Sequence, residues 1–408
     1  MTPALRILVV SDVSPLPISG GAERVLWEEA SRLHKLGHRV RVLSRSRADG
    51  VAETVEQEGV RIRHFPVDRR SPLQFARTSI LEARRAAAHE LAGTGADVLH
   101  LHQPYSGYGV LRSPAGRSIP SLYTFLSPAP LEYRSRVGMT GLHKGGWTRS
   151  LGIALLWILE GACLKRATRI RVLSNFSADL LWKLYRIPED RIVRIPGGVD
   201  TERFQPAADR TAVRNALGLP ARLPLLFTLR NLEARMGLEI LIRAMAILRR
   251  HVPEALLLIG GMGSLRDDLE SLTASLDLTD HVRFLGFVPD DQLPLYYQAA
   301  DLFVLPTREL EGFGLVTVEA LACGTPVLGT PIGATPEILL PLRSDLIFPG
   351  TDPDAIAKLI LEHHHRLRSD LDGYQDLRNA CRRHAFDRYA WPPLIKALEE
   401  VLLKATET

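Results

Sequence analysis

Two acidic residues stand eight positions apart on a glycine-bearing segment in the second half of the sequence. Glu311 precedes Gly312-Phe313-Gly314, and Glu319 falls about one turn inside a helix that we predict to begin near Leu315. A carboxylate accepts two hydrogen bonds at once, which suits the paired hydroxyls of a sugar or a ribose. The helix N-terminus between them would offer free backbone N–H groups to a diphosphate. The segment therefore predicts one loop that holds sugar, phosphate and ribose together.

Two further glycine-bearing turns follow predicted strands and lead into predicted helices. They contain Gly20-Gly21 and Gly261-Met262-Gly263. Adjacent glycines let the backbone approach a phosphate, so we expect these turns to contact the phosphate groups of the same sugar- and ribose-bearing ligand. Each could equally be an ordinary tight turn. A dinucleotide cofactor is disfavoured. The spacing G-x-G-x-x-G is absent, and the second strand ends at Ser44-Arg45 without the acidic residue that would hold a ribose.

The acidic segment resembles the Glu-x7-Glu motif of family-four retaining glycosyltransferases, and the resemblance extends over almost the whole chain. The other matching segments are Ser19–Gly37, Asp97–His102, Ile195–Phe204, Cys323–Val327, Gly333–Glu337 and the start of a last helix at Trp391. The resemblance implies that Glu311 contacts hydroxyls of the donor sugar and that Glu319 holds the ribose diol. The other donor contacts that it implies on this segment come from Gly312, Phe313, Gly314, Leu315 and Val316.

The family also places an arginine and a lysine on the loop after the first strand of the second domain, where they neutralise the leaving diphosphate. Arg230 matches the arginine if the loop is allowed one extra residue, and Met236 occupies the lysine position. Arg235 is adjacent, and an arginine can bind phosphate with two hydrogen bonds. The alternative for Arg235 is a solvated surface side chain.

A second departure from the family lies beside the reacting sugar, where many members carry Thr-Phe-His. This sequence has Thr124-Phe125-Leu126, and leucine cannot orient a proton. His102 or His100 on the neighbouring strand could compensate, and we include His102 among the expected catalytic residues with Glu311. Both histidines could equally be buried at the end of a strand.

Short apolar runs alternate with helical patterns along the chain, which is typical of βαβ units and parallel sheets. We predict strands over 7–10, 40–43, 60–65, 98–101, 122–125, 170–173 and 192–195, and then over 225–229, 256–259, 282–285, 302–305 and 327–328. We predict helices over 22–36, 238–250, 264–276 and 354–367. The expected fold is α/β of the GT-B type, with two doubly wound Rossmann-like domains that face a cleft. Ligands bind such sheets beyond the carboxyl ends of the strands.

Domain boundaries follow from a polar, proline-bearing stretch at 201–210. We expect an acceptor-side domain over 1–205, a nucleotide-sugar-binding domain over 206–387, and a last helix at about 388–408 that crosses back to the first domain.

Composition excludes several classes of protein. The three cysteines lie far apart, which disfavours a disulfide framework and a structural zinc site. Asp352-Pro353-Asp354 begins a predicted helix, where aspartates cap N–H groups, so we predict no metal site. We see no targeting segment, and the apolar run 151–159 is too short to span a membrane.

The charge is divided unevenly along the chain. Residues 1–205 carry 30 Lys and Arg against 19 Asp and Glu, a net of +11, and the remainder carries a net of −6. The first half is therefore expected to meet an anionic partner, such as the inner face of a membrane.

These observations favour a cytoplasmic enzyme that transfers a hexosyl group, with retention, from a nucleotide sugar of the UDP or GDP type to a glycan, glycolipid or lipid-linked acceptor. No cofactor and no nucleic acid are expected. Two alternatives stay open: a sugar-nucleotide epimerase of the same fold, and a non-catalytic nucleotide-sugar-binding protein, for which Leu126 and Met236 are the motive.

Overall fold

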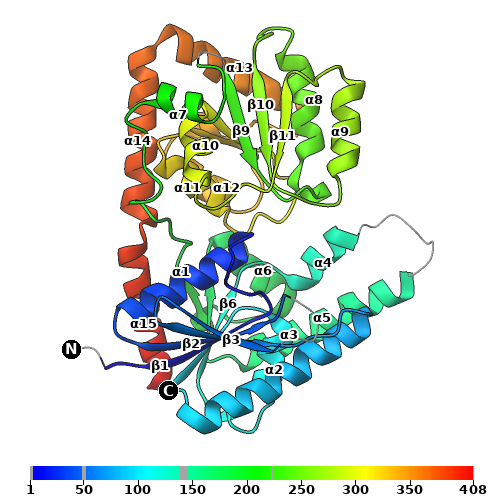
Figure 1. Cartoon of the computed structure of the whole chain (residues 1–408), viewed down its shortest axis with the longest axis vertical. Coiled ribbons are helices and arrows are strands. Elements are labelled where there is room, and N and C mark those ends of the chain that lie inside the picture. The colour runs from blue at the N-terminus through cyan, green and yellow to red at the C-terminus, as the bar shows by residue number, and fades with distance from the viewer. Residues whose placement is uncertain (1–2, 48–51, 138–145, 222–223, 408) are drawn as a thin grey trace. The chain divides into compact units, whose positions relative to one another are not determined.

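The computed structural model describes residues 3–47, 52–137, 146–221 and 224–407 (Figure 1). The chain forms two compact units. The first contains Met1–Pro196 together with Pro392–Thr408, and the second contains Gly197–Trp391.

The first unit is built on one eight-stranded sheet in the order β3-β4-β2-β1-β5-β6-β7-β8. All neighbouring strands are parallel except β3, which pairs antiparallel with β4. The strand order reverses between β1 and β5, which makes the sheet doubly wound. The strands are β1 (Arg6–Ser11), β2 (Arg39–Arg45), β3 (Glu53–Gln57), β4 (Val60–Phe65), β5 (Val98–Leu101), β6 (Ser121–Phe125), β7 (Arg169–Val172) and β8 (Ile192–Arg194).

Apolar side chains alternate along the central strands, so that each face of the sheet has its own core. On one face, Ile7 and Val9 pack with α1 and with the C-terminal helix α15. On the other face, Leu8 and Val10 pack with α2, α3, α5 and α6. The helices of this unit are α1 (Gly21–Lys35), α2 (Pro72–Thr94), α3 (Pro104–Leu111), α4 (Ala129–Val137), α5 (Gly146–Arg166), α6 (Asn175–Tyr185) and α15 (Trp391–Thr406).

The C-terminal helix α15 completes the core of the first unit. Ile395, Leu398, Leu402 and Ala405 are all buried in the cluster that contains Ile7. A polar contact fixes the same helix, because His38 Nδ1 accepts the Leu5 N–H and its Nε2 therefore donates to Glu399 Oε1 over 3.0 Å.

The second unit contains a fully parallel five-stranded sheet in the order β11-β10-β9-β12-β13, which reverses between β9 and β12. Its strands are β9 (Leu225–Leu229), β10 (Leu256–Gly260), β11 (Val282–Gly286), β12 (Leu302–Leu305) and β13 (Val327–Gly329). Its helices are α7 (Arg210–Ala216), α8 (Leu238–Leu248), α9 (Arg266–Ser275), α10 (Leu293–Ala299), α11 (Leu315–Ala322), α12 (Thr335–Leu339), α13 (Pro353–Ser369) and α14 (Leu371–Tyr389).

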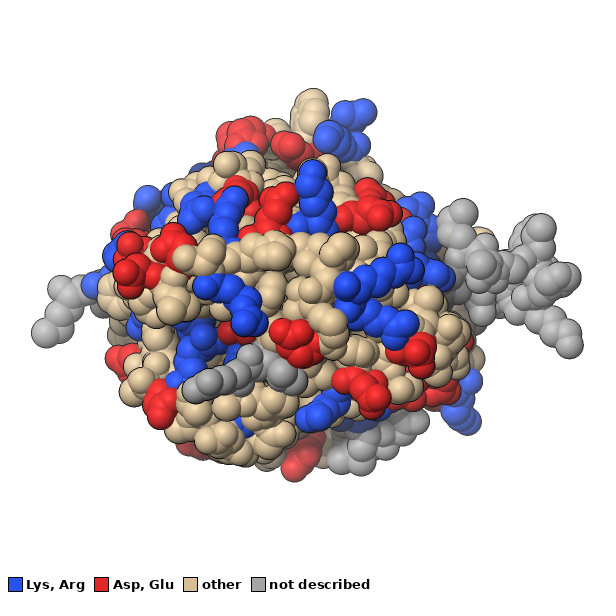
Figure 2. Space-filling view, turned by 90° about the horizontal axis from the view of Figure 1, so that it is seen from above, with Lys and Arg blue, Asp and Glu red and all other residues tan. Residues whose placement is uncertain are grey.

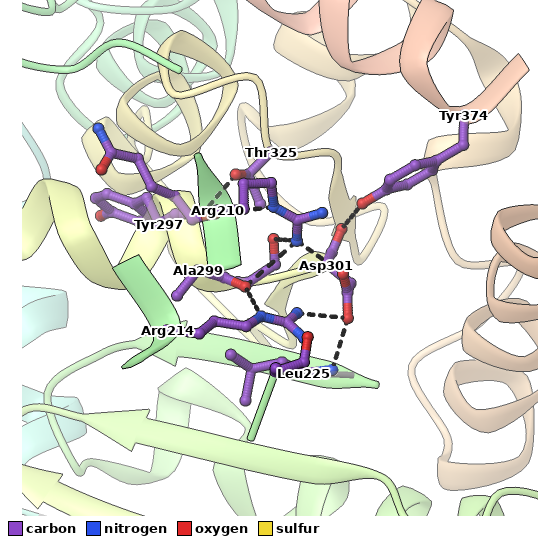
Figure 3. A network of polar contacts seen from close by, with 11 residues as sticks. Arg210, Arg214, Leu225, Tyr297, Ala299, Asp301, Thr325 and Tyr374 are labelled. Carbon is purple, nitrogen blue, oxygen red and sulfur yellow. Dashed lines mark hydrogen bonds and ion pairs between the residues drawn. The ribbon is translucent and has the colours of Figure 1, made fainter. Parts of the chain in front are cut away.

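A partly buried ion network fixes the amino ends of two neighbouring strands of this sheet, β9 and β12 (Figure 3). The Asp301 carboxylate lies between two arginines, at 2.7 Å from Arg210 Nη2 and 2.9 Å from Arg214 Nη2. It also accepts the Leu225 N–H at 2.8 Å, and the Tyr374 hydroxyl donates to the Asp301 carbonyl at 2.7 Å. Because Leu225 begins β9 and Asp301 immediately precedes β12, the network sets the relative position of the two strands between which the strand order reverses.

Acidic and basic side chains are intermixed on the face of the molecule seen in Figure 2, so neither sign of charge is concentrated there. No helix in the described ranges is long and apolar enough to cross a membrane.

Candidate active site

Two side chains of opposite charge meet at the carboxyl ends of β9 and β12, where the strand order of the second unit reverses. Arg230 directly follows β9, and Glu311 lies on the loop after β12. Arg230 Nη2 is 2.6 Å from Glu311 Oε2 and 3.0 Å from Thr307 Oγ1, and the Thr307 hydroxyl donates to the same carboxylate oxygen at 2.9 Å. Glu311 is buried, as Arg230 is, so this pair is little screened by water.

The loops that carry Arg230 and Glu311 are locked together by a glycine. Gly237 has φ +74°, a left-handed conformation that favours glycine, and a Cβ at this position would stand 1.9 Å from the Pro306 carbonyl oxygen. The Arg308 N–H donates to the Arg235 carbonyl at 2.8 Å, so the two loops also share a backbone hydrogen bond. Their contact is therefore fixed by main-chain geometry.

The loop after β12 is strained just before it enters α11. Leu310 adopts φ +57°, which is unfavourable for a branched side chain, and Gly314 follows with φ +81° as the residue that caps α11. The first N–H groups of a helix have no intrahelical partner, so those of Leu315 and Val316 point out of α11 at this end. Strain of this kind concentrates at functional sites.

Glu319 lies on the buried side of α11, and only 2% of it is exposed. Its Oε2 accepts a hydrogen bond from the Tyr297 hydroxyl on α10 at 2.8 Å. The structure therefore gives Glu319 a defined protein partner, and its contact with a ribose stays a prediction.

The loop after β9 brings Arg235 and Met236 close to the acidic segment. Arg235 is partly exposed, and its Nη1 donates to the Leu310 carbonyl at 3.2 Å. Met236 is buried, and its sulfur lies 2.8 Å from Arg230 Nη2. Met236 thus packs under Arg230 and supplies no positive charge.

The glycines of the loop after β10 have a packing role. A Cβ on Gly261 would lie 2.0 Å from the Arg230 carbonyl oxygen, and one on Gly263 would lie 2.4 Å from that of Leu232. Only glycine therefore lets this loop lie against the loop that carries Arg230. A donor contact for either residue is a separate prediction.

In the first unit, Gly20 and Gly21 stand where the sequence placed them, at the N-terminus of α1. Gly20 is the N-cap residue of α1 and has no side chain to cap the helix, and Gly21 is exposed. The free N–H groups at this helix end could face a phosphate.

His100 and His102 both lie in the interior of the first unit, beside Glu29 and Arg171. The Arg171 guanidinium forms an ion pair with Glu29 and donates to the Ile195 carbonyl at 3.1 Å. Burial lowers the pKa of His102 to about 3, so this ring is neutral at physiological pH. The sequence leaves two roles open for these histidines, a catalytic one and a place in the core at the end of a strand. Their burial agrees with the second role. Contact between His102 and a substrate stays a prediction.

Among the described residues, a single group of side chains could hold a metal ion by its geometry. It consists of Glu29, His100 and His102, whose donor atoms lie within 4.8 Å of one another. Glu29 is already neutralised by Arg171, and the Nδ1 atoms of both histidines lack a hydrogen-bond partner among the described residues. Histidines that bind a metal normally donate that second N–H. The arrangement therefore fits a buried ion cluster better than a metal centre. Asp352, the other candidate, caps α13 through the Ala355 N–H at 2.9 Å.

Sequence reasoning missed three polar side chains at the site of the second unit. Thr307 bridges Arg230 and Glu311, Tyr297 holds Glu319, and Thr317 presents a buried hydroxyl with no partner among the described residues in the first turn of α11. Thr317 could have been found, because it lies inside the acidic segment. The other two become visible only when distant loops meet.

The two units each contain a largely parallel, doubly wound sheet, and the second carries a charged pair and a helix N-terminus at its switch point. This combination is typical of glycosyltransferases of the GT-B class. Comparison with known proteins supports this class in both halves. Residues 19–203 match the model "Glycosyltransferase Family 4", and residues 209–375 match "Glycosyl transferases group 1". Sucrose-phosphate synthase from Thermosynechococcus elongatus has the same fold, with a TM-score of 0.82 at 23% identity over 98% of each chain.

Curated relatives place the chain in its family. It is 30% identical to a D-inositol 3-phosphate glycosyltransferase of Salinispora arenicola over 94% of this chain and 87% of the relative. It is 34% identical over 246 residues to a GDP-mannose-dependent alpha-(1-6)-phosphatidylinositol monomannoside mannosyltransferase of Mycolicibacterium smegmatis, and this match spans 60% of that relative. The chain belongs to the glycosyltransferases of family 4.

Proposed function

We propose that this glycosyltransferase transfers a hexosyl group from a nucleoside-diphosphate sugar with retention of the anomeric configuration. The observation that carries the proposal is the buried pair of Arg230 and Glu311 at the switch point, next to the N-terminus of α11. Open α/β sheets bind ligands at this position, and the pair combines an acceptor for sugar hydroxyls with a donor for phosphate oxygens.

Each group has a defined task in the proposed reaction. Glu311 accepts hydrogen bonds from hydroxyls of the donor sugar, and Glu319 holds the ribose. Arg230, Arg235 and the first N–H groups of α11 stabilise the negative charge that develops on the leaving diphosphate. The Nε–H of Arg230 supports this role, because it is buried and has no partner among the described residues.

Retention needs no protein nucleophile in this scheme. The bond between the anomeric carbon and the diphosphate breaks, and the acceptor oxygen attacks from the same face. The acceptor proton passes to the departing diphosphate oxygen, so atoms and charge balance without a side chain that is consumed.

The donor is of the GDP or UDP type, and the name of the mannosyltransferase relative favours GDP-mannose. Isothermal titration calorimetry of GDP, UDP and ADP would select the nucleotide. NMR of the product would then report the anomeric configuration, and inversion would overturn the proposed mechanism. A new nucleotide-sugar isomer formed without acceptor would indicate an epimerase, whereas binding without turnover or hydrolysis would indicate a non-catalytic protein.

We further propose that the acceptor is lipid-linked and that α5 contacts an anionic membrane surface. Leu151 and Ile158 on α5 are 66% and 67% exposed, and Lys165 and Arg166 follow on the same helix. Exposed apolar residues with basic neighbours favour interfacial binding.

Other aromatic and basic residues within or close to α5 in the sequence would also suit a membrane surface by type, but not all of them are available for it. Trp157 packs against Tyr185 at 5.1 Å between ring centroids, and Arg171 is buried. Lys144 and the side chains of Trp147 and Arg149 lie outside the described residues.

Sedimentation with vesicles tests the contact between α5 and an anionic membrane surface. We expect binding to phosphatidylglycerol vesicles that Ile158→Ser weakens and 1 M NaCl abolishes, and no binding to anionic vesicles at low salt would contradict it.

A further inference from the structure

Arg45 is a partly buried cation of the first unit with no charged partner in contact. It is the last residue of β2, and its guanidinium lies over the ring of Phe75 on α2, 4.5 Å from the ring centroid. The guanidinium makes no hydrogen bond or close ion pair with any residue in the described ranges. Burial lowers the pKa of Arg45 from its ordinary value, which reflects the cost of keeping this charge away from water.

The nearest carboxylate does not satisfy this cation. Asp12 follows β1, and its two oxygens accept the N–H groups of Tyr105 at 3.0 Å and Ser106 at 2.8 Å. Asp12 therefore serves mainly to cap α3, and its remaining influence on Arg45 acts through space.

A second cation adds to the positive charge at this place. Arg69 follows β4, is exposed, and donates to the Ser46 carbonyl, which directly follows Arg45 in the chain. Arg69 lowers the pKa of Arg45 further by repulsion between like charges. An anion bound between the two guanidinium groups would relieve that repulsion and fill the empty donors of Arg45.

The hydroxyl of Tyr105 is close enough to Arg45 to interact with it electrostatically, and it supplies a neutral donor there. The Tyr105 ring meets Phe75 edge-on at 5.8 Å between centroids, so Phe75 contacts both Arg45 and Tyr105. Burial raises the pKa of Tyr105 to about 12, so the phenol keeps its proton at physiological pH. Because β1, β2, β4 and β5 end at one edge of the sheet, all of these groups lie at the edge where α/β proteins bind ligands.

We propose that Arg45, Arg69 and Tyr105 bind a phosphate group of the acceptor, so that the substrate class is a phosphomonoester or phosphodiester of a polyol. The inference rests on the proposed transferase function and names the acceptor for it. Arg45 contributes two parallel hydrogen bonds to the phosphate, Arg69 a second positive charge, and Tyr105 an O–H donor. The contact with Phe75 holds the Arg45 guanidinium in place before the ligand arrives.

A stacking role alone is the competing explanation for Arg45. A cation over an aromatic ring is attracted by the negative face of the ring, and no anion is needed for this contact. It does not call for a second arginine beside the first, and it leaves the N–H donors of Arg45 unmatched. Arg45→Lys separates the two explanations, because it keeps a cation near Phe75 but loses the paired hydrogen bonds.

Calorimetry on the full chain tests the phosphate site. The nucleoside diphosphate that the protein binds is present at saturation, so that its own phosphate site is filled. The probes are D-inositol 3-phosphate (a phosphomonoester), glycerophosphoinositol (a phosphodiester like a lipid headgroup) and myo-inositol, which lacks phosphate. We expect one of the phosphate-bearing probes to bind at least tenfold more tightly than myo-inositol, and its identity separates a free sugar phosphate from a lipid headgroup.

Variants locate the site. Arg45→Gln should raise the Kd of the phosphate-bearing probe about tenfold or more and leave the Kd of myo-inositol and of the nucleotide unchanged. Arg45→Lys should also raise the Kd of the phosphate-bearing probe, but by less than Arg45→Gln, because it keeps the positive charge and loses only the paired hydrogen bonds. Arg69→Gln changes an exposed residue and serves if Arg45→Gln does not fold. Arg85→Gln, which removes the same charge from an exposed position on α2, should have no effect.

The two failures are distinguishable. A protein that binds nucleotide but binds every probe equally, or that loses phosphate-bearing and phosphate-free probes alike in Arg45→Gln, would overturn the phosphate site only. A protein that binds no nucleotide and consumes no nucleotide sugar would overturn the proposed transferase function itself.

Discussion

Arg230 and Glu311 are 81 positions apart in the sequence, yet Arg230 Nη2 lies 2.6 Å from Glu311 Oε2 in the interior of the second unit. Removing one member of a buried pair strands the other charge, so Arg230→Met should lower the free energy of unfolding by about 3 kcal/mol. The double variant Arg230→Met/Glu311→Gln should recover much of that stability while turnover stays about 100-fold below wild type. Urea unfolding and donor turnover measure the two effects separately.

The matched control for this cycle is an exposed pair on α8. Arg243 Nη2 is 3.0 Å from Glu239 Oε1, and Arg243→Met should change stability by about 0.5 kcal/mol or less. If the double variant of the buried pair regained full turnover, Arg230 and Glu311 would be structural residues only.

The diphosphate role of Arg235 predicts a loss that depends on the ligand. Arg235→Ala should weaken a nucleoside diphosphate by about 1–3 kcal/mol and the bare nucleoside hardly at all, because only the diphosphate offers a charge-assisted hydrogen bond. Calorimetry with both ligands makes the comparison. Equal losses would show that Arg235 holds the base or supports the fold through its contact with Leu310.

Glu319 and Tyr297 form a second pair, and the contribution of each residue to nucleotide binding can be measured separately. Glu319→Ala should weaken nucleotide binding by about 1–3 kcal/mol, since a charged hydrogen bond to the ribose is lost. Tyr297→Phe removes only the 2.8 Å hydrogen bond that orients Glu319 and should cost about 1 kcal/mol of the same affinity. Unchanged nucleotide affinity in Glu319→Ala would remove this residue from the site.

Gly237 and Gly218 offer a matched test of how the site loops are held. Both have positive φ, +74° and +63°, but a Cβ on Gly218 meets nothing within 4 Å, whereas one on Gly237 would stand 1.9 Å from the Pro306 carbonyl oxygen. Gly218→Ala should therefore lower the free energy of unfolding by about 1 kcal/mol. Gly237→Ala should lower it by about 3 kcal/mol or more and should also reduce donor turnover. Equal melting temperatures for the two variants would show that the loops do not depend on this contact.

A buried carboxyl group predicts how stability changes with pH. Burial raises the pKa of Glu160 on α5 to about 8, and its carboxyl group contacts the Tyr185 hydroxyl and the Ala129 N–H. The folded state thus keeps a proton that the unfolded chain releases near pH 4.5, so the contribution of Glu160 to stability falls between about pH 4.5 and 8 by a few kcal/mol. Glu160→Gln should be more stable than wild type at pH 8 and similar at pH 5. Thermal unfolding at both values checks this, and parallel pH profiles for the two proteins would contradict it.

Most strands could be predicted, because buried parallel strands are short apolar runs. The missed strand β3 shows the limit. Glu53–Gln57 is polar and largely exposed at the edge of the sheet, so it lacks the apolar signal, and its strand character depends on pairing with β4. The long helices α2 and α14 also lie outside the predicted helical ranges, although Ser71 caps the first through the Gln74 N–H.

The site was predicted unevenly for a similar reason. Glu311, Arg230 and the glycines are recognisable by their residue types next to strand ends. The contacts of Thr307 with Arg230, and of Tyr297 with Glu319, depend on how β9, β12 and α10 pack, and no local pattern encodes them. The clearest surprise is Arg171, which counts toward the net charge of +11 from which an anionic partner is inferred but is buried against Glu29.

The place of α15 in the core of the first unit has a consequence for biosynthesis. A ribosome makes the strands of that unit first, yet Leu398 and Leu402, which cover Ile7 and Val9, emerge only after the whole second unit has been translated. Until then one face of the nascent sheet keeps an apolar strip uncovered, which chaperones would recognise and which favours aggregation. Premature termination anywhere before Trp391 should therefore yield a defective first unit, even where most of the second unit has already been made.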